Sequence, residues 1–140
     1  MFTMTVAGAE TFTVSKECIA SAKFITNITK DSDARTADMG TTLEIRGKVL
    51  TAVDGDPFDS TRKMALWSTV PAQKADCYRN VTLKNVRGNV VVREYNFPNA
   101  FVVDYVENFD DKEGVGTFTL IIKQKKDRIE HVAVNGGFTG

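Results

Sequence analysis

Apolar and polar residues alternate along several segments of this sequence, and no other feature limits the fold so strongly. In residues 42–49, Leu, Ile, Gly and Val alternate with Thr, Glu, Arg and Lys. Such alternation places one row of side chains in a core and the other in solvent, as in half-buried β-strands. Further runs of this kind occupy residues 11–14, 81–84 and 117–123. The sequence therefore predicts a mainly β protein.

Two segments, residues 90–92 and 101–106, are apolar on both faces. In an antiparallel sheet this pattern predicts cover on both sides, by a helix, the opposite sheet of a sandwich or a neighbouring subunit. Turn residues at 87–89 and 110–114 separate the strands, and Gly88 supplies the positive φ that a hairpin turn often requires. We therefore expect hairpin connections between these strands.

One short helix is expected after the turn at residues 54–57. Asp59 or Ser60 is a candidate N-cap, and the helical segment ends before Pro71. Met64 and Trp67 stand three residues apart, so they share one helical face. We expect this face to cover one open end of the sheet.

Residues 29–40 are rich in charge and poor in apolar side chains, which predicts a long, mobile loop. Its charged residues are the candidate site residues of this sequence. They are Lys30, Asp31, Asp33, Arg35 and Asp38.

A chain of 140 residues and 15.4 kDa is expected to form one domain, residues 1–140, with a packed core. Its 18 basic and 18 acidic residues balance, so no sequence-wide cationic field draws the chain onto nucleic acid. Cys18 and Cys77 are expected to stay reduced as small buried residues. The N-terminal residues lack the pattern of a signal peptide, which predicts a cytoplasmic product. The apolar runs are too short to cross a bilayer, so we expect no membrane insertion.

Motifs for catalysis or for cofactor binding are missing from the sequence. No nucleophile motif accompanies His131 for which it could act as a catalytic base, so we expect it on a partly exposed strand. Together with Cys18 and Cys77 it is too scattered for a zinc site. The acidic residues at 110–113 are expected on an exposed turn. The sequence thus predicts no enzyme, no cofactor and no metal.

A basic cluster near the C-terminus, Lys123, Lys125, Lys126 and Arg128, includes no aromatic residue that could stack on bases. We expect it to form a solvated edge or a subunit contact.

The order of segments in residues 76–138 carries a family resemblance. YRNVTL at 78–83 is followed by YNFPNAFV at 95–102, DYVE at 104–107, a Gly-containing turn and TFTLIIKQ at 117–124. In this order the chain resembles the tail-tube family, which comprises the tube proteins of contractile phages and phage-tail-like particles and the hemolysin-coregulated (Hcp) protein of type VI secretion. The predicted helix at 60–69 also falls where that family places its single helix.

The resemblance implies a small antiparallel β-barrel or two-sheet sandwich with one short flanking helix. It further implies a homo-oligomer, in which hexameric rings stack into the hollow tube of a contractile injection system. The expected partners are sheath and baseplate proteins, with effector or DNA cargo in the lumen, in a virion or a secreted particle. In such an assembly, the loop at 29–40 is the candidate segment for reaching the adjacent ring.

A different class of function is a monomeric β-barrel binding module for a peptide or small ligand. This alternative predicts that Trp67, Tyr95 and Tyr105 lie near a common pocket.

Overall fold

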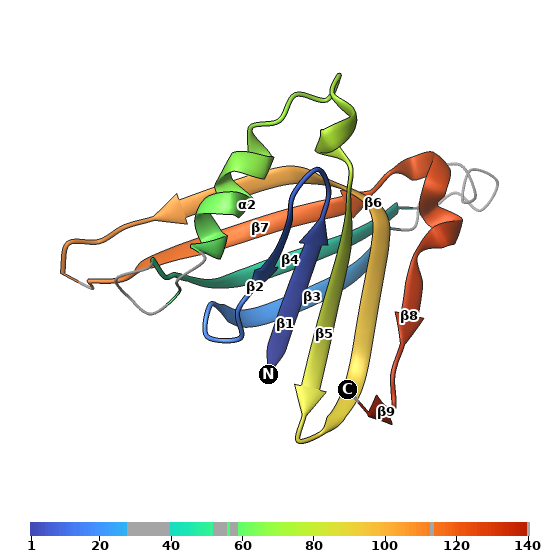
Figure 1. Ribbon diagram of the computed structural model, residues 1–140, viewed down its shortest axis with the longest axis horizontal. Coiled ribbons are helices and arrows are strands. Elements are labelled where there is room, and N and C mark those ends of the chain that lie inside the picture. The colour runs from blue at the N-terminus through green and yellow to red at the C-terminus, as the bar shows by residue number, and fades with distance from the viewer. Residues whose placement is uncertain (28–39, 52–55, 57–58, 113, 140) are drawn as a thin grey trace.

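The computed structural model describes residues 1–27, 40–51, 56, 59–112 and 114–139, and it is mainly β (Figure 1). Its one α-helix among these residues is α2, Ser60–Ser68, and two 3₁₀ helices follow, η1 at Ala75–Cys77 and η2 at Lys126–His131. The strands are β1 Phe2–Ala7, β2 Thr11–Val14, β3 Ile19–Asn27, β4 Gly40–Val49, β5 Arg79–Arg87, β6 Val90–Asn108, β7 Gly116–Gln124, β8 Ala133–Asn135 and β9 Phe138–Thr139.

All strand pairs are antiparallel, and the strands form one large sheet in the order β2-β1-β5-β6-β7-β4-β3. β8 and β9 pair with the first half of β6. The sheet bends into two layers, with β2, β1 and β5 in front of β7, β4 and β3 (Figure 1). This confirms the predicted class, an antiparallel β fold with one short helix. Pairing between the end strands β2 and β3 is not found among the described residues.

β6 passes from one layer to the other, and it bends around Pro98. Val81 of β5 pairs with Phe97, whereas Arg79 pairs with Ala100, so the register skips at Pro98 and Asn99. Proline has no N–H group, so it cannot donate a backbone hydrogen bond to a neighbouring strand. The Asn99 N–H instead donates to the side-chain oxygen of Gln124 at 2.9 Å. The two apolar segments at 90–92 and 101–106 therefore belong to one continuous, bent strand.

The alternating segments place their apolar rows in the space between the layers, as the sequence predicts. The buried apolar residues of these segments are Phe12, Val14, Leu43, Ile45, Val49, Val81, Leu83, Phe118, Leu120 and Ile122. Gly47 is buried in the same row, and glycine is needed there because a Cβ would lie 1.7 Å from the Cys18 carbonyl oxygen. This oxygen accepts a hydrogen bond from the Lys48 N–H at 2.7 Å, which joins the chain before β3 to β4.

β6 has apolar side chains on both faces, and only one of these faces is covered. Val91 is buried, but Val90, Val103 and Val106 are 43%, 48% and 41% exposed. Of the three kinds of cover that the sequence allows, the described residues supply two, the opposite layer and helix α2. Both leave these outward valines exposed.

Helix α2 packs Met64 and Trp67 into the core, where both are almost fully buried, as predicted. Asp59, one of the two predicted positions, is the N-cap residue of the helix, but it has a left-handed φ of 48° and its side chain makes no cap bond. The carboxylate of Asp56 accepts instead from the Ser60 N–H at 3.0 Å and from the Ser60 hydroxyl at 2.7 Å. The turn before the helix thus supplies the acceptor for its first N–H group.

The predicted hairpins are present, with φ of 61° at Gly88 in the β5–β6 turn and 74° at Gly114 in the β6–β7 turn. Cys18 and Cys77 are free and buried, as expected. None of the helices in the described ranges is long and apolar enough to cross a membrane.

Candidate functional site

The candidate site residues from the sequence, Lys30, Asp31, Asp33, Arg35 and Asp38, lie outside the described residues. The described chain offers three other features with functional meaning: the free edges of the sheet, an ion-pair cluster that holds α2, and a pocket beside it.

The chemistry-bearing residues weighed in the sequence do not meet. His131 is exposed at the end of η2, not on a strand as predicted, because β8 begins only at Ala133. The Asp110 carboxylate accepts from the Lys112 N–H at 2.9 Å, a contact within the turn. Within the described ranges, no three His, Cys, Asp or Glu side chains are grouped closely enough to hold a metal.

The sheet has free edges at β2 and β3. Among the described residues β3 pairs only with β4, and β2 pairs only with β1. β3 is nine residues long, and Lys23 is its one charged residue. A strand edge of this length presents a row of backbone groups that can pair with another chain.

The outward faces of both layers carry ion pairs and polar side chains. On the face of β3 and β4, the Arg46 guanidinium binds the Glu44 carboxylate at 2.6 Å, beside Lys23 and Ser21 in a shallow groove. On the face of β1, β2 and β5, the Lys84 ammonium lies 3.8 Å from the Glu94 carboxylate, and uncharged polar side chains also meet across strands. The Asn96 amide donates to Thr82 at 2.9 Å and to Asn80 at 2.6 Å.

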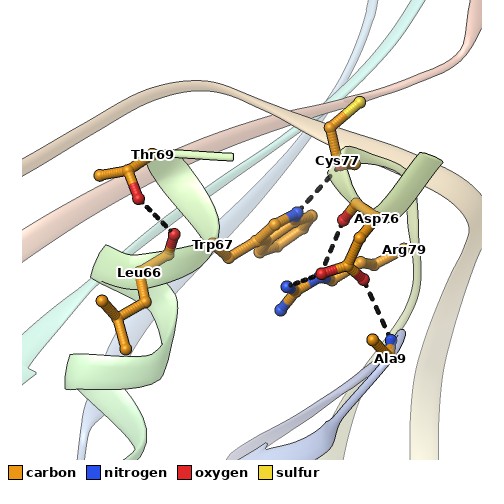
Figure 2. Close-up of polar contacts among 7 residues, drawn as sticks. All are labelled: Ala9, Leu66, Trp67, Thr69, Asp76, Cys77 and Arg79. Carbon is orange, nitrogen blue, oxygen red and sulfur yellow. Dashed lines mark hydrogen bonds and ion pairs between the residues drawn. The ribbon is translucent and has the colours of Figure 1, made fainter. Parts of the chain in front are cut away.

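An ion-pair cluster joins α2, η1, β5 and the turn between β1 and β2 (Figure 2). The Arg79 side chain, 9% exposed, binds the Asp76 carboxylate at 2.7 Å and lies 5.5 Å from the Trp67 ring centroid. The Trp67 indole N–H donates to the Cys77 carbonyl at 2.9 Å. The cluster therefore ties helix α2 to the start of β5.

Asp76 also accepts a hydrogen bond from the Ala9 N–H at 3.0 Å. This bond, followed by the hydrogen bond and charge of Arg79, lowers the pKa of the Asp76 carboxyl from its ordinary value. Gly8 allows the Asp76 carboxylate to lie close to the β1–β2 turn, because a Cβ at residue 8 would be 2.8 Å from that carboxylate. At this same C-terminal end of α2, the Thr69 hydroxyl donates to the Leu66 carbonyl at 2.7 Å, in the turn that closes the helix before Pro71 (Figure 2).

A pocket of about 160 Å³ lies between the end of α2, η1 and β6. We call it the α2–β6 pocket, and its walls include Trp67, Val70, Cys77, Tyr78, Phe101 and Val102. Tyr78 and Phe101 meet edge to face with centroids 5.9 Å apart, and the Lys125 ammonium lies 5.1 Å from the Tyr78 centroid. The basic cluster of the sequence thus reaches the rim of this pocket through Lys125.

The expectation that Trp67, Tyr95 and Tyr105 share a pocket is wrong. Tyr95 lines a second pocket, of about 110 Å³, beside Phe24. The Tyr105 hydroxyl donates to Glu107 at 2.6 Å, and burial together with this bond raises the pKa of Tyr105. Tyr95 and Tyr105 both lie on β6, which carries them into different layers, whereas Trp67 lies on α2. No sequence signal marked Tyr78 and Phe101 as the partners of Trp67.

The chain matches no protein-family model, and no curated protein matches it. Solved structures do match over nearly its whole length. Hcp1 from Flavobacterium johnsoniae is 18% identical, with 98% of each chain covered and a TM-score of 0.56. A chain of the anti-feeding prophage (AFP) baseplate, 6-fold symmetrised, is 12% identical, with 96% of this chain and 92% of that chain covered and a TM-score of 0.55.

A chain of the PVC sheath–tube complex, an extracellular contractile injection system in its extended state, is 13% identical. It covers 97% of this chain and 88% of its own length, with a TM-score of 0.51. At such low identity these matches establish the fold. The protein has the fold of Hcp and of tail-tube subunits of contractile injection systems, as the sequence resemblance predicts.

Proposed function

We propose that this chain is a structural subunit that assembles into hexameric rings, which stack into the hollow tube of a contractile injection system. The near full-length likeness to Hcp1 and to a chain of the PVC sheath–tube complex supports this proposal. We propose no catalytic role for it.

The observation that carries the proposal is a pair of unequal edges that pair with no further strand in the part of the chain that the structure describes, a four-residue edge at β2 and a nine-residue edge at β3. Natural monomers blunt such edges with charges, prolines or covering loops, and β3 carries one lysine and no proline. Two different edges on one chain pair head to tail, and such a contact closes into a ring when the rotation is right. The exposed valines of β6 supply apolar surface for the same assembly.

We propose sheath and baseplate proteins as the partners of the assembled tube, and effector or DNA as the cargo of its lumen. The similar chains from AFP and PVC belong to a baseplate and a sheath–tube complex, respectively. The chain is made in the cytoplasm and acts within a virion or an exported particle.

Residues Lys30, Asp31, Asp33, Arg35 and Asp38 are proposed to contact the next ring. The support is their place in the sequence, between the paired ends Asn27 and Gly40 of the β3–β4 hairpin, and their mixed charge.

Electron microscopy of the purified protein, alone and with its sheath and baseplate partners, tests the function. We expect sixfold rings and stacked tubes. A strictly monomeric protein in sedimentation at high concentration, with those partners present, contradicts the proposal.

A matched pair of variants tests the role of the β3 edge. Ser21→Lys adds one charge at an exposed position of this edge, and we expect fewer rings. Thr117→Lys adds charge at an exposed position of the central strand β7 and serves as the control. Equal ring formation by both variants contradicts pairing through β3.

A further inference from the structure

The α2–β6 pocket has the size of one aromatic ring. Its volume is about 160 Å³, and a dry apolar cavity of about 150 Å³ holds one benzene molecule. Trp67, Val70, Phe101 and Val102 give it apolar walls. No described side chain fills it, so the pocket suits an aromatic group from outside this chain.

The chain presents such a group beyond the C-terminal end of β6. Phe109, just beyond this strand, is 69% exposed, the highest value among the large apolar side chains described. Its ring lies against Gly116 of β7, where a Cβ would come within 2.4 Å of the ring. The missing side chain of Gly116 thus lets Phe109 rest on the hairpin with most of its ring in solvent.

Phe109 cannot reach the pocket of its own chain. Phe101, in the pocket wall, precedes it by eight residues, which is ~26 Å along an extended strand. β6 is paired with β7 from Ala100 to Asn108, so the strand cannot fold back. Figure 1 shows this hairpin extending away from the end of α2 that borders the pocket. Only a Phe109 from another copy can enter.

The charges beside the two surfaces are opposite. Asp110 and Asp111 follow Phe109 directly, and both are exposed. At the pocket, the Lys125 ammonium lies over the Tyr78 ring and 3.9 Å from the exposed Asp127 carboxylate, and Lys123 pairs with Phe101 in the β6–β7 ladder. Two lysines and one aspartate at this rim leave a net positive charge. An acidic tip that approaches a basic rim is guided into register and accelerated by this complementarity.

We propose that Phe109 of one copy inserts into the α2–β6 pocket of a second copy, with Asp110 and Asp111 facing the basic rim. The proposal rests on the proposed function, since it names a contact through which copies of this chain assemble. The surfaces that meet are different, so the contact is heterologous and repeats from copy to copy, around a ring or along a stack.

Three substitutions test the contact. The quantity measured for each is the total protein concentration at which half of the chains are assembled. Phe109→Ala removes the ring, and Ala72→Phe fills the pocket from an exposed position in its wall. We expect each to raise this concentration about tenfold or more, as truncation of an interface anchor does. Phe138→Ala, which removes an exposed ring on β9, is the matched control and leaves it unchanged.

Two further variants examine the same contact. The double variant with Phe109→Ala and Ala72→Phe is expected to assemble no worse than either single variant, because both remove one interaction. Asp111→Lys brings a cation to the basic rim and is expected to raise the half-assembly concentration. Full additivity in the double variant overturns the pairing of these two surfaces.

Trp67 is the only tryptophan, so its indole N–H signal reports on the pocket. The contact is supported if wild type and Phe138→Ala both assemble and the Trp67 signal shifts on assembly. It also requires that Phe109→Ala and Ala72→Phe lose both the assembly and the shift. Assembly of Phe109→Ala at the wild-type concentration overturns the contact and leaves the tube proposal standing. A wild type that stays monomeric with its partners, with a constant Trp67 signal, overturns both.

Discussion

Phe24 of β3 and Tyr95 of β6 stack with ring centroids 4.8 Å apart and planes 17° from parallel, although the two strands share no ladder of hydrogen bonds. Phe24 also meets Phe97 edge to face at 6.2 Å. Stacked and edge-to-face rings of this kind stabilise a contact beyond the area they bury. Side chains therefore hold the two layers together while the backbone of β3 keeps a free edge.

This arrangement bears on the proposed assembly. Apolar contacts within one chain form the core between the layers. Among the described residues, the outer backbone groups of β3 and β2 pair with no further strand, and Val90, Val103 and Val106 of β6 are exposed. In the proposed tube, these groups would contact other copies of the chain.

The cap of α2 gives the first prediction. Asp56→Ala removes the acceptor for both the N–H and the hydroxyl of Ser60, so we expect the free energy of unfolding to fall by about 1–2 kcal/mol. Urea denaturation followed by circular dichroism measures this change. Asp59→Asn is the control, because Asn tolerates the left-handed φ of 48° and Asp59 makes no cap bond. A larger loss in the control than in Asp56→Ala would falsify this assignment of the cap.

Much of the fold could be predicted because the apolar rows of the alternating segments are the buried ones, although Thr42 of the polar row is also buried. In β4, Leu43, Ile45 and Val49 are buried, as the alternation requires, and in α2 the spacing of Met64 and Trp67 identifies the buried face. These signals are local, so the sequence contains them in full.

The features that escaped prediction depend on contacts distant in sequence. β3 includes small residues such as Ala20 and Ser21 among its apolar ones, and its burial depends on β4 and on Tyr95. The continuity of β6 through Pro98 depends on Gln124, whose side chain binds Asn99. The walls of the α2–β6 pocket come from elements that no local pattern joins, so the partners of Trp67 were not predictable.

The buried row of β7 gives the second prediction. Leu120→Ala leaves a cavity between the layers, and we expect the free energy of unfolding to fall by roughly 2–5 kcal/mol. Ile121→Ala, on the opposite face of the same strand and half-buried, is the control, with an expected loss below about 1.5 kcal/mol. Urea denaturation measures the loss of unfolding free energy in each variant, and equal losses in the two variants would contradict the assignment of the faces.

Asp76 predicts a dependence of stability on pH. The folded protein holds the pKa of this carboxyl below its ordinary value of 3.8, first through the Ala9 N–H and then through Arg79. Because the folded pKa lies below the unfolded one, the ionised group stabilises the fold above pH 3.8, and this contribution is lost as the pH falls through the folded pKa.

Asp76→Asn removes this titration. We expect the variant to be less stable than wild type near neutral pH, and the two free energies of unfolding to converge as the solution is made more acidic than pH 3.8. Urea denaturation at a series of pH values gives both curves. A gap that stays constant across the series would mean that the Asp76 charge contributes nothing to stability.

The segment between β3 and β4 gives the last prediction. Asn27 and Gly40 are paired, so deletion of residues 31–38 leaves residues 28–30 and 39 to connect the strands, a common length for a hairpin loop. We therefore expect the deletion variant to keep the wild-type circular dichroism spectrum and to form rings. If the charged residues of this segment contact the next ring, these rings stack into shorter tubes, which electron microscopy measures as a length distribution. Replacing residues 31–38 by an equal number of Gly and Ser residues separates the loss of charge from the loss of length. Tubes of wild-type length from both variants would remove this segment from the stacking contact, while the free edges at β2 and β3 would still account for the ring.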